Sequence, residues 1–138
     1  MRTQIDSFTL DRSGRPHAAP GPPYAAQGLG PFGSQFRPTS PDRLFVDNAH
    51  NGTGLATVSA YDDLRGGTLS PIGASPFADF QAAPCCLVIS PDGRCLYAVD
   101  TGSAEISSYS FASDGTLTRA TRRSAPPPAS PDPTPRCA

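Results

Sequence analysis

The sequence predicts an all-β fold of short antiparallel strands, and three observations support this prediction. Glycine and proline together make up 30 of the 138 residues, which leaves little room for long helices. Lysine is absent, Glu105 is the only glutamate and methionine occurs once, so good helix formers other than alanine are scarce. The chain also repeats itself with a period of about 50 residues. These features exclude a helical bundle or a coiled coil.

The repeat is anchored by three aromatic residues, Phe8, Tyr61 and Tyr109. Three positions before each anchor lies a β-branched aliphatic residue, and six positions after it lies a glycine. In the second and third copies this glycine begins a Gly-Thr-Leu phrase. The first two anchors are 53 residues apart and the last two are 48 apart. Such a period indicates one supersecondary unit per copy.

Each unit is expected to contain four short strands. The last unit shows this best, with apolar or alternating runs at 85–90, 95–99, 105–111 and 117–121. The first two runs flank the tetrapeptide Pro-Asp-Gly-Arg, in which proline presets φ and glycine accepts a positive φ. An Asp-Gly turn separates the last two runs. The alternation of the third run is clear, but the face that it buries is not.

Four antiparallel strands in about 50 residues are typical of one blade of a β-propeller. We therefore expect a β-propeller fragment of about two and a half four-stranded antiparallel blades. Its parts would be a partial blade of outer strands with a connector at 1–31, a blade with its connector at 32–84, a blade at 85–122 and a proline-rich disordered tail at 123–138. The strands should include Phe36, Leu44, Val58, Val88, Leu96 and Ile106, with no helix of three turns.

The phrase Ser-Pro-Asp-Gly-Arg at 90–94, followed by Leu-Tyr-Ala-Val-Asp at 96–100, resembles a family of proteins. These are the lactonase-type seven-bladed β-propellers, which include relatives of 6-phosphogluconolactonases and carboxymuconate cyclases. Matching phrases in the third and fourth runs extend the resemblance over about residues 5–121. It implies a hydrolase that opens a sugar or muconate-type lactone. Many relatives begin the innermost strand with Asn-Pro-His, but the positions of that histidine are Phe32 and Cys85 here.

Propellers close with about four to eight blades, and fewer are expected here. The chain is therefore expected to be a fragment, inactive alone, that needs its missing blades or self-association. A small-molecule lactone or sugar acid would be its partner if it is active, and no cofactor is expected. The alternative is a non-catalytic propeller repeat protein that serves as a binding or surface module. The replaced histidine favours this alternative.

Two residues are candidates for a catalytic role. His50 lies in the loop 47–54, where the loops around a propeller channel would meet, and could act as a general base. The competing interpretation is an exposed loop histidine. Glu105 could act as an acid, or it is a surface group at the start of a strand. His17 lies in a proline-rich connector and is not expected to have a role. Cys85 as a nucleophile lacks an evident base and oxyanion site, so a structural role is favoured for it.

Cysteines occur at 85, 86, 95 and 137 without a Cys-x-x-Cys pair, so no metal site is expected. A bridge between Cys86 and Cys95 across a hairpin is one alternative for these thiols. The other is that the strand cysteines are small core residues.

Charge and hydropathy exclude further partners. The net charge of −1 gives no reason to expect nucleic acid or an anionic membrane. The longest apolar run in the middle of the chain is far shorter than the roughly 20 residues of a membrane-spanning helix. Residues 1–6 are not followed by the apolar core of a signal peptide, which favours the cytoplasm as written; a truncated N-terminus would instead allow the periplasm or secretion. Arg119, Arg122 and Arg123 are expected on a solvated face.

Overall fold

The computed structural model describes residues 3–21 and 23–120. Within these ranges the regular elements are thirteen β-strands, all of whose pairings are antiparallel. The described residues contain no helix with the length and apolar character needed to cross a membrane. The prediction of a disordered tail at 123–138 concerns residues outside the described ranges.

The strands form three groups along the chain. The N-terminal unit contains β1 (Gln4–Ile5), β2 (Phe8–Leu10), β3 (Pro16–Ala18) and β4 (Tyr24–Ala25). The middle sheet contains β5 (Pro31–Arg37), β6 (Ser40–Asn48), β7 (Thr57–Leu64), β8 (Thr68–Pro71) and β9 (Phe77–Ala78). The C-terminal sheet contains β10 (Pro84–Ile89), β11 (Cys95–Asp100), β12 (Glu105–Phe111) and β13 (Leu117–Arg119), in that order. The all-β prediction is confirmed.

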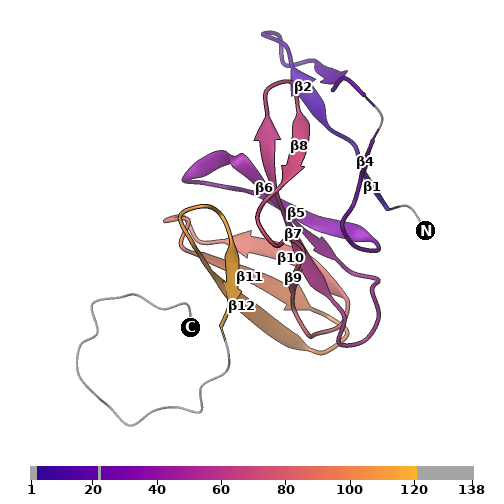
Figure 1. Ribbon diagram of the computed structural model, residues 1–138, viewed down its shortest axis with the longest axis vertical. Coiled ribbons are helices and arrows are strands. Elements are labelled where there is room, and N and C mark those ends of the chain that lie inside the picture. Colours follow the sequence, from indigo (N-terminus) through magenta and orange to yellow (C-terminus); the bar gives the residue numbers. More distant parts are fainter. Residues whose placement is uncertain (1–2, 22, 121–138) are drawn as a thin grey trace.

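The three groups are stacked face to face, with the middle sheet between the other two (Figure 1). One face of the middle sheet packs against the C-terminal sheet through a buried cluster that includes Phe45, Val58, Leu96 and Tyr109. The opposite face packs against the N-terminal unit through Leu44, Val46, Tyr61 and Leu69, on which Ile5 and Tyr24 lie. Face-to-face stacking of successive antiparallel sheets is the arrangement of blades in a β-propeller, so the chain is part of a propeller-like fold.

The pairing registers reproduce the sequence repeat. Phe8 pairs with Ala18 and Ile5 with Tyr24 in the N-terminal unit. The pairs Tyr61–Pro71 and Val58–Phe77 of the middle sheet are the same pairs shifted by 53 residues. Tyr109–Arg119 of the C-terminal sheet follows after a further 48 residues. The β6–β7 loop at 49–56 is four residues longer than the β11–β12 loop at 101–104, which accounts for most of the shorter second period.

The repeated glycines occupy equivalent turns. Gly14, Gly67 and Gly115 have φ values of 80°, 79° and 91°, a region that side chains disfavour. Each donates its backbone N–H to the carbonyl oxygen three residues earlier. The glycine of the repeat is therefore required by the backbone of the hairpin turn.

The middle sheet has five strands, although four were expected. The outer strand β8 pairs only with residues 61–64 of β7. The start of β7 is therefore free to pair with β9, at Thr57–Ala78 and Val58–Phe77. β9 could not be predicted, because a two-residue strand has too few positions for a detectable alternation.

Neither of the two interpretations of the strand cysteines holds for Cys86. Cys86 and Cys85 are free thiols, and Cys86 is exposed rather than part of the core. In the β10–β11 hairpin Cys86 lies opposite Val99, whereas Leu96, next to Cys95, lies opposite Ile89. A Cys86–Cys95 bridge is therefore excluded by the register.

Candidate functional site

The loops that lead into the innermost strands meet the loops between the second and third strands. Ala49 and His50 donate their backbone N–H groups to Gly30 and Leu29, at 2.9 and 3.0 Å. The C-terminal sheet makes the same two backbone hydrogen bonds one repeat later. The N–H of Thr101 donates to the carbonyl oxygen of Ala83, and that of Gly102 donates to the carbonyl oxygen of Ala82. His50 therefore occupies the position that is Gly102 in the next sheet. This end of the structure is where a site was expected.

His50 is an exposed residue of this loop pair. Its ring lies against the backbone of Gly30, where an added Cβ would stand 2.1 Å from Cδ2 of His50. Glu105 belongs to the other sheet, where it is the half-buried first residue of β12 opposite Asp100. The two catalytic candidates therefore belong to different units, His50 to the β6–β7 loop and Glu105 to β12, and neither lines the groove described below.

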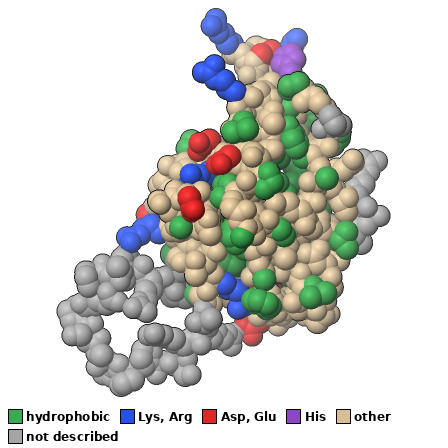
Figure 2. Space-filling model, viewed as in Figure 1, with side chains coloured by type: hydrophobic (Ala, Val, Ile, Leu, Met, Phe, Trp, Pro, Cys, Tyr) green, Lys and Arg blue, Asp and Glu red, His purple; other side chains and the backbone are tan. Residues whose placement is uncertain are grey.

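The other candidate side chains have local partners. His17 is exposed and lies 3.1 Å from Oδ2 of Asp11 within the β2–β3 hairpin. Figure 2 shows a histidine among charged side chains at this tip of the molecule. The sulfur of Cys85 lies 3.6 Å from that of Cys86. This hydrogen bond, together with burial, raises the pKa of the Cys85 thiol, which disfavours the thiolate that a nucleophile requires.

Three carboxyl groups are fully buried between the middle and C-terminal sheets. Asp47 ends the apolar run of β6, Asp79 follows β9 and Asp100 ends β11, and the exposed fraction of each is 0%. Arg119 and Ser107 complete this group, which we call the interblade cluster. Such burial is costly for carboxylates unless they are paired or protonated.

A chain of polar contacts joins Asp100 to Asp79. The hydroxyl of Ser107 donates to Oδ2 of Asp100 at 2.8 Å and accepts from the Arg119 guanidinium at 3.2 Å. Arg119 also donates from Nε to Oδ1 of Asp79 at 3.3 Å, as an ion pair with a fully buried carboxylate. Burial, followed by the neighbouring Asp79, raises the pKa of Asp100 to about 7. Arg119 is therefore a partner of buried acids and not a member of a solvated face, which corrects the prediction for this arginine.

Asp47 lies where the innermost strands of the two sheets approach each other. Its Oδ1 accepts from the backbone N–H of Gly33 at 2.9 Å. A Cβ on Gly33 would stand 2.5 Å from Oδ2 of Asp47 and 3.1 Å from Cα of Cys86, so glycine is needed for this approach. Burial raises the pKa of Asp47 to about 6.

The three carboxyl groups of the interblade cluster are closed to solvent, and Asp100, whose pKa is raised to about 7, can hold a proton at neutral pH. One oxygen each of Asp47, Asp79 and Asp100 is buried without a hydrogen-bond partner. The described residues contain no group of His, Cys, Asp and Glu side chains arranged to hold a metal ion. The contacts of the cluster join residues of the middle and C-terminal sheets.

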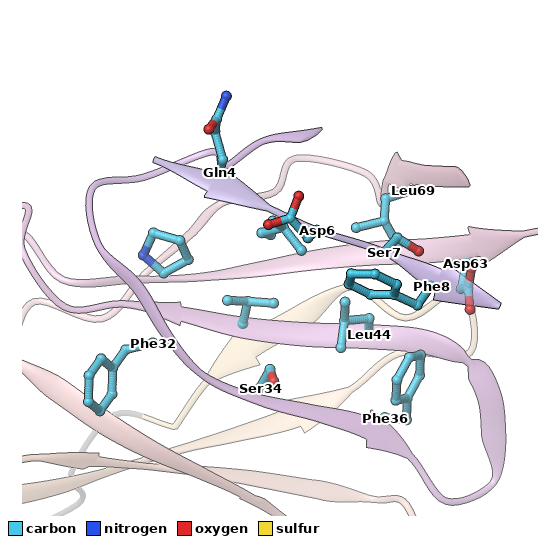
Figure 3. Close-up of a pocket in the computed structure, with 13 residues that line it drawn as sticks. Gln4, Asp6, Ser7, Phe8, Phe32, Ser34, Phe36, Leu44, Asp63 and Leu69 are labelled. Atoms are coloured by element: carbon cyan, nitrogen blue, oxygen red, sulfur yellow. The ribbon is translucent and has the colours of Figure 1, made fainter. Parts of the chain in front are cut away.

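A cavity of about 430 Å³ lies on the other face of the middle sheet. Figure 3 shows β1 and β2 on one side of it and Phe32, Ser34 and Phe36 of β5 on the other. Leu44 forms part of its floor, and Asp63 stands at one end. We call this cavity the N-terminal groove.

Sequence reasoning missed the interblade cluster. The available signal was an aspartate that ends each apolar second strand, after Phe45-Val46 and after Ala98-Val99. A charged residue that directly continues a buried run calls for a partner. Asp79 and Arg119 gave no such signal, because their contact joins segments 40 residues apart.

Comparisons with known proteins concern the fold. No family model matches the sequence, and no curated protein matches it significantly. A solved structure of a protein of unknown function from Desulfotomaculum acetoxidans is similar over 83% of this chain, with a TM-score of 0.64 and 20% identity. A protein from Bacteroides fragilis, named a "putative 6-phosphogluconolactonase", is similar over 85% of the chain, with a TM-score of 0.67 and 19% identity. The chain spans about a third of the length of each, 33% and 32% respectively.

Proposed function

We propose that this chain provides blades of a lactonase-like, seven-bladed β-propeller whose activity is the hydrolysis of a sugar or muconate-type lactone. The observation that carries the proposal is the fold shared with the Bacteroides fragilis protein over 85% of the chain. The Ser-Pro-Asp-Gly-Arg phrase at 90–94 supports the same lineage. The 138-residue chain alone is proposed to be inactive, with missing blades or self-association needed to complete a site.

Lactone hydrolysis needs several groups at one place. Water adds to the ring carbonyl carbon, the ring C–O bond breaks and a hydroxy acid is released. A base must accept the proton of the water, and donors must stabilise the oxyanion. His50 is the described residue best placed for the base, because it is exposed where the loops meet. Its exposure and its separation from Glu105 support the need for groups from other blades.

The second candidate is a non-catalytic propeller that serves as a binding or surface module. The replacement of the family's histidine by Phe32 and Cys85 at both innermost strands favours it. The Phe32 side chain has no group that accepts a proton, and the pKa of the Cys85 thiol is raised, so neither residue substitutes for an imidazole base.

The test is a lactone assay on the purified 138-residue chain, after light scattering has established its oligomeric state. A panel of sugar and aromatic-acid lactones at neutral pH should show no turnover above buffer. The matched controls are His50→Ala and His17→Ala. Turnover that His50→Ala abolishes and His17→Ala leaves intact would refute inactivity and make His50 the base. Binding of sugar acids without turnover would favour the non-catalytic alternative.

A further inference from the structure

The N-terminal groove is bordered by an unpaired strand edge. In the two larger sheets the third strand is paired on both sides: β7 with β6 and β8, and β12 with β11 and β13. The equivalent strands of the N-terminal unit, β1 and β2, pair only with β4 and β3 among the described residues. The backbone of residues 4–10 therefore offers a free edge directly beside the groove. Such edges accept an added strand.

The groove also leaves apolar side chains uncovered at positions that the repeat buries elsewhere. Phe36 of β5 is 47% exposed, whereas Ile89, its equivalent in β10, is 4% exposed. Ile89 is covered because the β5–β6 hairpin packs on β10. The groove is continuous with the existing contact of Ile5 and Tyr24 on the same face of the middle sheet. The uncovered part is therefore the part that an inner hairpin would cover.

The charge of the groove indicates which type of residue the covering hairpin would have near its turn. In the contact between the two larger sheets, Arg37 lies at the end of β5, with its guanidinium 4.4 Å from the ring centroid of Phe111. The position equivalent to Phe111 in the middle sheet is Asp63, since both face the repeated leucine of the outer strand. Asp63 lines the groove, and one of its carboxylate oxygens is buried without a partner. A basic residue at the position of Arg37 would pair with it.

We propose that the N-terminal groove is the docking site of a β-hairpin from outside the described residues, which adds to the free edge of β1–β2. The hairpin would have two antiparallel strands with apolar side chains on its docking face and an arginine or lysine just before its turn. A second folded copy of residues 3–120 is not the occupant, because each of its inner hairpins is already paired with a third strand. The proposal depends on the repeat geometry and not on lactone chemistry, so it fails or stands separately from the proposed activity.

The experiment supplies the hairpin from the chain's own repeat. A copy of residues 28–55 is placed directly before Thr3 in the full chain, in place of residues 1–2. Because Ala56 and Thr3 are equivalent, this fusion keeps the spacing of the natural unit. The readout is hydrogen exchange of the amides at 4–10, which report pairing of the edge. We expect exchange of the edge amides to slow at least about tenfold, together with a higher melting temperature.

Charge reversal tests the specific pairing and controls for general stabilisation. Arg37→Asp in the copied hairpin should remove most of the protection, and Asp63→Arg in the body should restore it. Leu55→Asp at the original position 55 of the body, an exposed loop residue that does not line the groove, serves as a control and should change nothing. Unchanged exchange at 4–10 in the fusion would overturn the proposal. The proposal would also be overturned if the unfused chain formed a dimer that protects these amides, because a second copy would then occupy the groove.

Discussion

Replacing Asp100 by asparagine should stabilise the protein at neutral and alkaline pH. Asp100 is 0% exposed, and its pKa is raised from 3.8 to about 7 by burial and by Asp79. Asparagine has nearly the same shape and can still accept the hydrogen bond from Ser107. Because the side chain at 100 is hydrogen-bonded with Asp79, the new amide can also donate to that carboxylate. The middle sheet already has asparagine here, since Asn48 is the equivalent of Asp100 and donates to Ser59 at 2.8 Å.

The pH dependence follows from the direction of this shift. Between pH 4 and pH 7 the folded state holds a proton at Asp100 that the unfolded chain releases, so stability falls as pH rises and levels off above 7. At about 1.4 kcal/mol per pKa unit, the loss is on the order of 4 kcal/mol. Asp100→Asn removes it, so the variant should match the wild type near pH 4 and exceed it by about 2–4 kcal/mol at pH 8.

The assay is urea unfolding followed by circular dichroism from pH 4 to pH 8. Asp47, whose pKa is also raised, is present in both proteins, so the difference between them isolates Asp100. Asp92→Asn is the control, because hydrogen bonds from Ser90 and Arg94 lower the pKa of this exposed carboxyl. The stability that Asp92 contributes is present above pH 4 and is lost as the pH falls below it. The Asp92→Asn substitution should therefore not change the slope of stability against pH between pH 4 and 7. Parallel pH profiles for wild type and Asp100→Asn would refute the reasoning.

Three further substitutions test the contact between the larger sheets, each measured by urea unfolding at pH 7. Gly33→Ala should cost about 1–3 kcal/mol, because the new methyl group collides with Asp47; a neutral result would show that the sheets can separate freely. Phe45→Ala should cost about 3–5 kcal/mol, since the ring is fully buried, and a loss below 1 kcal/mol would contradict its place in the core. Arg119→Met should cost about 3–5 kcal/mol by leaving Asp79 unpaired, and equal stability would mean that the ion pair contributes nothing.

The strands were predictable because their signals are local. Turn residues with fixed backbone demands, such as Gly67 and Gly115, punctuate the apolar runs, and all six residues named as strand members lie in strands. The buried face of 105–111 was not predictable. Tyr109 is buried and Ile106 is 65% exposed, because the face is chosen by the neighbouring sheet and not by polarity within the strand.

The candidate site was less accessible from the sequence. His50 could be placed in its loop, since the position depends only on the order of strands. Its partners could not, because they depend on contacts between sheets. The interblade cluster and the N-terminal groove both lie at such contacts, where segments from different repeats meet. Periodicity within one repeat carries no information about them.

Equivalent positions that carry different residues indicate where the units of this fold diverge. Tyr61 and Tyr109 share their register and burial, so they report only the requirements of a blade. Asn48 and Asp100 share a place at the end of a second strand, yet one is an amide and the other an acid with a raised pKa. Because the backbone requirement is the same at both, the acid is not explained by local structure. The acid at 100 must be explained by the residue that faces it, which is Asp79. One repeat earlier the position of Asp79 is occupied by Ala26, so Asn48 has no acid of this kind beside it. Divergent pairs of this kind therefore report the contacts between neighbouring sheets and not the requirements of a single blade.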